Sequence, residues 1–204
     1  MRKLLFLAVV LGLLAGADVA ARKVAEQRIA DRAEQAAGEG ATATARISSF
    51  PFVARLLVSG SVPKVSVHAR AVKAGAFRLS AVNLDLDGVA LDRHALYGGT
   101  AKLRDIDEGT VTVELDAALL SGVLELPVTI EDGAVRVGVL GQQVTAKADV
   151  RDGVLILGVA GIPALRVPVA RTELSPCDAA AVEVAGDRLR LTCRVRDVPP
   201  ALVG

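Results

Sequence analysis

The sequence predicts an α+β protein that consists mostly of antiparallel β-structure behind a long N-terminal helix. From Asp18 to Ala37 the chain holds residues of high helix propensity and neither Pro nor Gly, and Gly38 and Gly40 follow as a stop signal. After Ala41, polar and apolar residues alternate with a period of two. This alternation is typical of strands that have one buried face and one wet face.

The first seventeen residues form a leader of the export type. Arg2 and Lys3 precede an uncharged run over residues 4–17, which as a helix would be about 21 Å long, shorter than the ~30 Å hydrocarbon core of a bilayer. Residues 15–17 have the small-x-small form that signal peptidase cleaves, with Asp18 next. We therefore expect export to the outer face of the cytoplasmic membrane or to a periplasm-like cell envelope.

Two roles stay open for residues 1–17. They are either a cleaved signal peptide or a short membrane anchor, in which basic residues at the ends and local thinning of the bilayer make up the missing length. Residues 18–40 then form the helix, and residues 41–204 form a single β-rich domain that we interpret as lipid-binding.

The helix over residues 18–37 has a thin apolar stripe that can lie on a sheet but cannot fill a core alone. We place the pairs Asp18/Arg22 and Arg22/Glu26, four residues apart, on its solvent side. The stripe consists of Ala17, Ala21, Val24, Ile29, Ala33 and Ala36.

Six segments alternate strongly enough to be predicted as strands. Turn signals at Gly75 and at residues 131–133, 151–153 and 185–187 join consecutive strands into hairpins, which indicates one meandering antiparallel sheet. The segments are residues 64–71, 82–87, 111–115, 135–137, 144–150 and 189–196.

Three segments interrupt the alternation. Residues 49–57 are a short helix candidate, with Pro51 suited to a first turn and Gly60 as its end. Residues 117–124 are a second short helix candidate. Residues 154–165 are apolar on both sides, so they form either a strand buried on both faces or a segment that touches a membrane.

Composition and motifs argue against catalysis and against nucleic-acid binding. The net charge is +1, and the chain has no Trp, one Tyr and four Phe, so single-stranded nucleic acid would find few stacking side chains. His68 and His94 are the only histidines; we place His68 on the polar face of a strand and His94 in a loop, away from any nucleophile motif. Asp85 and Asp87 are neighbours on a wet strand face. We expect no enzyme activity, no cofactor and no metal site.

Two further groups of residues have competing interpretations. For an exported protein, a disulfide between Cys177 and Cys193 is favoured over two buried thiols and would stabilise the fold by roughly 3 kcal/mol. Four arginines share one face of the last strand, which is either a charged solvent face or a contact for anionic lipid headgroups. They are Arg188, Arg190, Arg194 and Arg196.

Several of these features together resemble the LmeA-like family of actinobacterial cell-envelope proteins. They are the leader, the Ala/Glu/Arg helix, Phe50-Pro51-Phe52 with Leu56, Leu57 and Gly60 behind it, and a strand ending in Leu86-Asp87-Gly88-Val89. The likeness spans nearly the whole chain, although Ser49 stands where the family usually has Gly. It implies a phospholipid-binding envelope protein, linked in mycobacteria to lipomannan synthesis. It also implies a tubular, BPI-like architecture, in which a strongly curved antiparallel sheet of long strands cradles the helix.

The physics of the strands is compatible with a lipid ligand. Long strands with small aliphatic inward residues leave either a groove or a fully packed sandwich. In a groove, an acyl chain of about sixteen carbons would gain on the order of 12 kcal/mol from burial. We therefore expect phospholipid and a membrane surface as partners, in a lipid-binding or lipid-shuttling role that maintains envelope lipid or lipoglycan. The alternative is an interaction module that docks an envelope protein, still unidentified, through its sheet edges.

The candidate lipid contacts fall into two groups. The first is either the mouth of the groove or a membrane contact, or else a hydrophobic plug on the sheet: Phe50, Phe52, Leu56 and Leu57. The second forms candidate walls of the groove: Leu119, Leu120, Val154 and Ile156.

Overall fold

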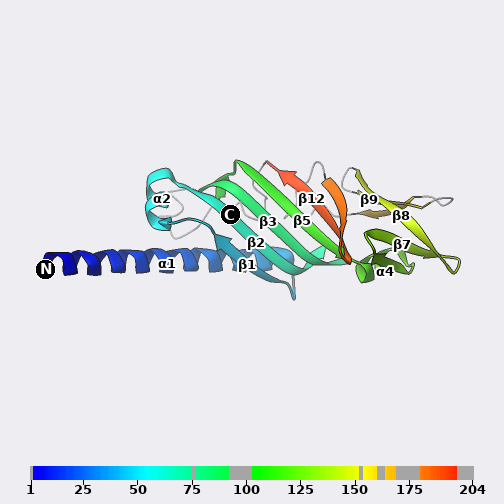
Figure 1. Ribbon diagram of the computed structural model, residues 1–204, viewed down its shortest axis with the longest axis horizontal. Coiled ribbons are helices and arrows are strands. Elements are labelled where there is room, and N and C mark those ends of the chain that lie inside the picture. The colour runs from blue at the N-terminus through cyan, green and yellow to red at the C-terminus, as the bar shows by residue number, and fades with distance from the viewer. Residues whose placement is uncertain are drawn as a thin grey trace.

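A single helix, α1 (Arg2–Ala37), joins the apolar leader to the predicted polar helix without a break. The computed structural model describes residues 2–74, 77–91, 103–151, 154–159, 164–168 and 180–196. The first part of α1 projects beyond one end of an elongated body, and the rest runs along it (Figure 1). The predicted helix end at Ala37 is confirmed, with Gly38 in a left-handed conformation directly after it.

The β-structure forms two antiparallel sheets rather than one. The larger, seven-stranded sheet has the order β1-β2-β3-β5-β12-β11, with β4 paired to β3. Its strands are β1 (Thr42–Ile47), β2 (Ser61–Ala74), β3 (Phe77–Leu91), β4 (Leu103–Asp105), β5 (Glu108–Asp116), β11 (Ala180–Ala185) and β12 (Arg188–Val195). The smaller sheet has five strands in the order β10-β9-β8-β7-β6. They are β6 (Val128–Glu131), β7 (Ala134–Val139), β8 (Gln142–Arg151), β9 (Val154–Val159) and β10 (Leu165–Pro168).

The α+β class and the antiparallel pairing are confirmed, whereas the prediction of one meandering sheet is wrong. After β5 the chain leaves the large sheet, builds the smaller sheet, and returns so that β12 pairs with β5. The pattern of alternation fixes which face of a strand is buried, but it does not say which strands pair. Local turns were easier to predict: Ala74 pairs with Phe77, and Glu131 with Ala134. The other two predicted hairpins, β8–β9 and β11–β12, are also present.

The long hairpin β2–β3 buries the residues that the alternation predicted, but the buried face shifts at two points. Val65 and Val67 point inward on odd numbers, whereas Val72 is buried beyond Ala71, whose φ is +54°. Gly88 has a φ of +62°, and a Cβ there would lie 1.8 Å from the carboxylate of Asp107. A left-handed residue inside a strand turns the following side chain to the other face, so the period of two restarts there.

Both short helices are confirmed. Helix α2 (Phe52–Ser59) starts one residue after Pro51 and ends at Gly60, whose φ is +69° and whose N–H donates to the Leu56 carbonyl. Helix α4 (Ala117–Leu124) contacts strands of both sheets.

The start of α4 is held by Asp116. Its carboxylate accepts hydrogen bonds from the Leu119 N–H at 2.7 Å and from the Ser80 hydroxyl. The bond from Ser80 holds the pKa of Asp116 below its ordinary value of 3.8, against the opposing effect of burial. The carboxylate therefore ties α4 to β3.

Carboxylates of α1 accept two backbone N–H groups at the open edge of the large sheet. Glu34 Oε1 accepts the Ala43 N–H at 2.8 Å, and Glu26 Oε1 accepts the Ile47 N–H at 2.9 Å. Glu26 and Glu34 are eight residues apart, a rise of about 12 Å along a helix. Ala43 and Ile47 are four residues apart, about 13 Å along a strand. Because the two spacings match, α1 takes the place of the missing neighbour of β1.

The placement of Asp18 and Glu26 on the solvent side of the helix is wrong. Each has only 7% of its surface exposed, because each accepts backbone N–H groups from elements packed on α1. The predicted Arg22–Glu26 pair exists at 4.0 Å, and Lys23 lies closer, at 3.1 Å. Burial opposes the charge on Glu26, but the bond from Ile47 and the two cations keep its pKa below the ordinary 4.5.

The predicted apolar stripe of α1 is correct only in part. Ala33 is buried, and Ala21 and Ile29 pack against the core, whereas Val24 is 48% exposed. Ala17 and Ala36 are exposed as well. The sheet-facing side of α1 therefore combines small apolar residues with carboxylates, a mixture that an apolar periodicity cannot identify.

Replacement of Glu26 by Ala should destabilise the fold by about 1–3 kcal/mol, because the Ile47 N–H loses its acceptor in a buried position. Urea unfolding followed by circular dichroism measures the change. Gln27→Ala, an exposed site on the same helix, is the control and should leave the midpoint nearly unchanged. Equal midpoints for the two variants would show that the carboxylate does not support the edge.

Stability should fall in acid through Glu26 and Asp116. Both pKa values are lower in the folded state, so their contribution is complete above the ordinary values of 4.5 and 3.8 and is lost as the pH falls below them. Asp116→Asn should give a weaker pH dependence of the unfolding free energy below about pH 4. Unchanged pH dependence in this variant would contradict the assignment.

Candidate lipid-binding site

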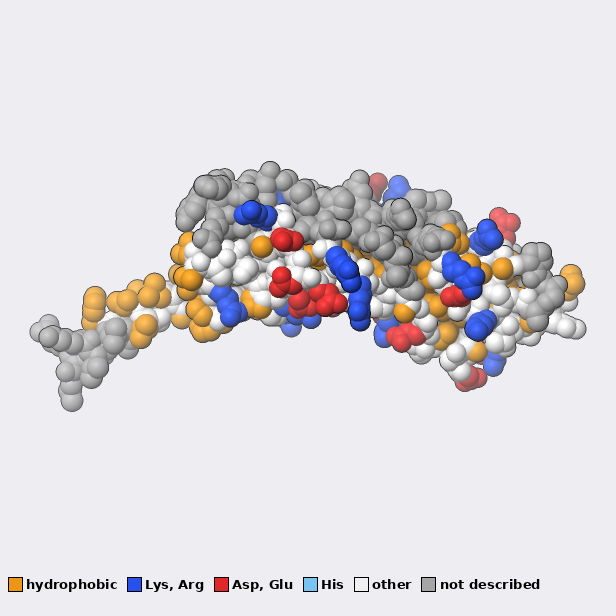
Figure 2. Space-filling model, turned by 90° about the horizontal axis from the view of Figure 1, so that it is seen from above, with side chains coloured by type: hydrophobic (Ala, Val, Ile, Leu, Met, Phe, Trp, Pro, Cys, Tyr) orange, Lys and Arg blue, Asp and Glu red, His pale blue; other side chains and the backbone are white. Residues whose placement is uncertain are grey.

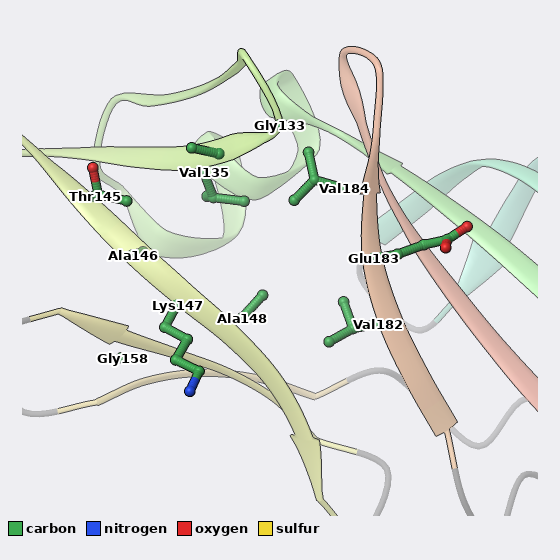
Figure 3. A pocket seen from close by; sticks show the side chains of 11 residues that line it. Gly133, Val135, Thr145, Ala146, Lys147, Ala148, Gly158, Val182, Glu183 and Val184 are labelled. Atoms are coloured by element: carbon green, nitrogen blue, oxygen red, sulfur yellow. The ribbon is translucent and has the colours of Figure 1, made fainter.

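A cleft with a mixed polar and apolar lining opens where the two sheets meet. It has a volume of about 500 Å³ and lies between β8 and β11, with the start of β7 and one residue of β9 at its sides (Figure 3). Its lining residues are Gly133, Ala134, Val135, Thr145, Ala146, Lys147, Ala148, Gly158, Val182, Glu183 and Val184. A volume of this size is within the roughly 300–1,000 Å³ of typical ligand pockets.

The cleft is the exposed margin of the shared hydrophobic core. Val182 and Val184 of β11 pair with the inward residues Leu191 and Leu189 of β12, so they belong to the inner face of the large sheet. Across the gap, Ala148 packs against the same core and is only half-buried. Apolar surface is therefore accessible here without any opening of the fold.

Small residues create this space. The inward positions of β8 alternate from Val144 through Ala146 and Ala148 to Val150, so its centre has only methyl groups where other inner strands carry Val or Leu. On β9, Gly158 contributes no side chain to the wall. The signal in the sequence is the pair of alanines in the middle of an inward-facing strand, and neither alanine is among the predicted site residues.

The charges at the cleft are unequal. Lys147 is exposed on the outward face of β8, and its side chain points away from β11 (Figure 3). Among the described residues it forms no ion pair with a carboxylate. Glu183, which also lines the cleft, is instead paired with Arg190 of β12 at 3.3 Å. One cation without an ion pair among the described residues therefore lies at the rim of the cleft, where the anionic group of a bound amphiphile would meet it.

The predicted residues around α2 divide into exposed and buried members. Phe50 is 71% exposed and Leu57 is 57% exposed, whereas Phe52 is buried and Leu56 packs partly against the core. Val58, which is not among the predicted contacts, is 81% exposed. Both interpretations of this segment are thus represented: Phe52 and Leu56 pack on the body, while the other side chains face outward.

Asp18 of α1 holds the start of α2. Its two carboxylate oxygens accept the N–H groups of Phe52 at 2.9 Å and Val53 at 2.6 Å. Pro51, next to these donors, is extended and has no N–H of its own to satisfy. The same carboxylate therefore fixes both the position and the direction of α2 relative to α1.

The candidate wall residues do not line the cleft. Leu120 is fully buried and Leu119 is partly buried in α4. In β9, Leu155 and Leu157 point into the core and alternate with the half-buried Val154 and Ile156. The first part of the segment over residues 154–165, which is apolar on both sides, is therefore a strand. Their role as walls stays a prediction.

The arginines of β12 lie on the outer face of the large sheet and contact carboxylates of neighbouring strands. Arg188 lies 2.9 Å from Glu114, and Arg190 lies 3.5 Å from the same group. Arg194 is 3.8 Å from Glu108, and Arg196 is exposed. A lipid phosphate would have to compete with these carboxylates, and headgroup contact by the arginines stays a prediction.

Other candidate residues are only partly described. Cys193 is buried in β12, but Cys177 lies outside the described residues, so their disulfide stays a prediction. His68 contacts the side chain of Asn83 and accepts a hydrogen bond from Arg70 on the polar face of β2. His94 also lies outside the described residues. Within the described chain, no helix has both the length and the apolar character to cross a bilayer.

Comparison with known proteins agrees with the resemblance seen in the sequence. No curated protein and no solved structure matches the chain. The profile of the LmeA-like phospholipid-binding family matches residues 16–203, which is nearly the whole chain after the leader. The chain therefore belongs to the LmeA-like phospholipid-binding family.

Proposed function

We propose that the protein binds one phospholipid with an acyl chain in the cleft between its two sheets. The observation that carries the proposal is half-buried apolar surface in a cleft of about 500 Å³, in a member of a phospholipid-binding family. An acyl chain placed against Ala148, Val182 and Val184 would cover surface that water now contacts. Each methylene buried there contributes about 0.8 kcal/mol.

Lys147 supports a ligand with a phosphate at the mouth of the cleft. It lies at the rim of the cleft on the outward face of β8, and the nearby carboxylate of Glu183 is already paired with Arg190. A phosphodiester next to Lys147 would form a charge-assisted hydrogen bond, while its hydrocarbon tail would lie between the strands. Binding needs no bond cleavage, so we propose a non-catalytic role.

We further propose that this binding takes place outside the cytoplasm, at a membrane surface of the cell envelope. The basic start and apolar run of the leader support export. Family membership supports phospholipid as the partner. A carrier role, in which lipid is shuttled for lipid or lipoglycan maintenance, fits a cleft that is open to solvent. We also propose that the architecture resembles the tubular, BPI-like lipid-binding domains. The long strands β2 and β3 beside α1 support this likeness.

Filling the cleft should remove the lipid. In Ala148→Phe, the added ring would occupy the space between β8 and β11, and we expect phospholipid affinity to fall by about tenfold or more, ~1.4 kcal/mol. Native mass spectrometry and lipid extraction of the purified protein measure the occupancy.

The matched control is Gln143→Phe, an exposed site on the same strand that does not line the cleft. Wild-type protein should carry nearly one phospholipid per chain, and the control should keep it. A wild-type protein free of lipid that instead captures a protein partner would favour the interaction-module alternative. Full occupancy in Ala148→Phe would mean that the lipid binds elsewhere.

Loss of the charge at Lys147 should weaken the binding of anionic phospholipid more than the binding of zwitterionic phospholipid. For Lys147→Gln we expect about three- to tenfold lower affinity for phosphatidylglycerol, because the contact is exposed and screened by salt. Titration with short-chain lipids followed by calorimetry gives both affinities. Lys64→Gln, at a partly buried lysine paired with Asp85, is the control. Equal losses for both headgroups would remove Lys147 from the headgroup contact.

A further inference from the structure

Exposed large apolar side chains are concentrated at one end of the protein. Among the described residues, ten of the eleven belong to α1 or lie in or beside α2. Those of α1 are Phe6, Val9, Leu11, Leu13, Leu14, Val19 and Val24, and those at α2 are Phe50, Leu57 and Val58. The eleventh, Leu140, lies in the hairpin between β7 and β8 at the opposite end (Figure 1). Soluble surfaces rarely gather apolar side chains in this way without a partner.

The form of this surface fits a bilayer better than a protein groove. Figure 2 shows hydrophobic side chains along the projecting part of α1 and on the adjoining end of the body. Residues 4–17 carry no polar side chain on any side of the helix, so the apolar surface is wider than the single stripe that a partner helix or groove would cover. A helix that is apolar all round requires an apolar environment on every side, which lipid provides.

The α2 side of the surface has the polar complement that a lipid headgroup layer requires. Arg55 is exposed on α2 and, in the described part of the chain, has no carboxylate within ion-pair distance. With Ser59 and Ser61 it lines a pocket of about 320 Å³. This pocket lies between α2, the start of β2 and the end of β3. An unpaired cation directly beside Leu57 and Val58 is the charge arrangement of an interfacial helix on anionic lipid.

We propose that this end of the protein docks on an anionic phospholipid bilayer, with the apolar part of α1 and the outer face of α2 entering the membrane together. Asp18 is the positioning residue. It ends the apolar part of α1 and holds the first two N–H groups of α2, so it sets the depth of α2 relative to α1. This inference builds on the proposed membrane contact but does not depend on lipid in the cleft.

The chain has no tryptophan, so a single indole can report the depth of each end. In the full-length Val58→Trp variant on vesicles of phosphatidylglycerol and phosphatidylcholine, we expect a blue-shifted emission that brominated acyl chains quench strongly. Leu140→Trp, at the opposite end, should show neither effect. Equal quenching at the two positions, or none at position 58, would overturn docking through this end.

The role of Asp18 is tested in the Val58→Trp background. Asp18→Ala should lose most of the quenching and speed hydrogen exchange at the amides of Phe52 and Val53, because α2 is then no longer held at its depth. Glu34→Ala removes an equivalent carboxylate that is bonded to β1 and should retain the quenching. Unchanged quenching in Asp18→Ala would show that α2 does not need this residue for its position.

Two further variants separate this inference from the proposed lipid site. Arg55→Gln should reduce binding to anionic vesicles while binding to phosphatidylcholine vesicles stays the same, and equal binding to both would remove Arg55 from the docking surface. Ala148→Phe should leave the quenching at position 58 unchanged. If the proposed lipid site in the cleft is wrong, only the lipid co-purification result will contradict it. If the proposed docking on the bilayer is wrong, only the tryptophan quenching will contradict it.

Discussion

The structure depends on how the open edge of the large sheet is satisfied. Strand β1 has a neighbour on one side only, so its outward N–H groups would otherwise be unpaired or available to another chain. Glu34 and Glu26 accept two of these donors, and Asp18 continues the series at the start of α2. Because each carboxylate comes from α1, the helix and the sheet edge stabilise each other, and neither is complete alone.

This arrangement links the architecture to the proposed function. The residues that satisfy the sheet edge are on the same helix that projects apolar side chains beyond the body (Figure 1). A rigid helix transmits position along its length, so the distance between the apolar end and the body is fixed by backbone geometry. The cleft lies at the junction of the two sheets, away from α2 along the long axis. The proposed membrane contact and the proposed lipid site are therefore separate surfaces of one molecule, so each can be tested without the other.

The cleft itself follows from the joining of two sheets over one core. Large aliphatic side chains such as Leu86 and Leu157 fill the centre of each sheet completely. At the margin, where the sheets diverge, Ala146 and Ala148 face Val182 and Val184, and these side chains are too short to close the gap. The accessible space is thus a property of side-chain volume at a few positions.

The sequence by itself determined the elements and their faces. Period-two alternation predicted the inward residues of β12 and of β2 as far as Ala69, the glycine-containing turns predicted four hairpins, and the family resemblance was correct. These features depend on neighbours along the chain, which local physics can predict. Only the tertiary structure decided that β12 pairs with β5, that Asp18 and Glu26 are buried, and that the cleft lies between β8 and β11. Each of these depends on residues far apart in the sequence, whose contacts no local pattern specifies.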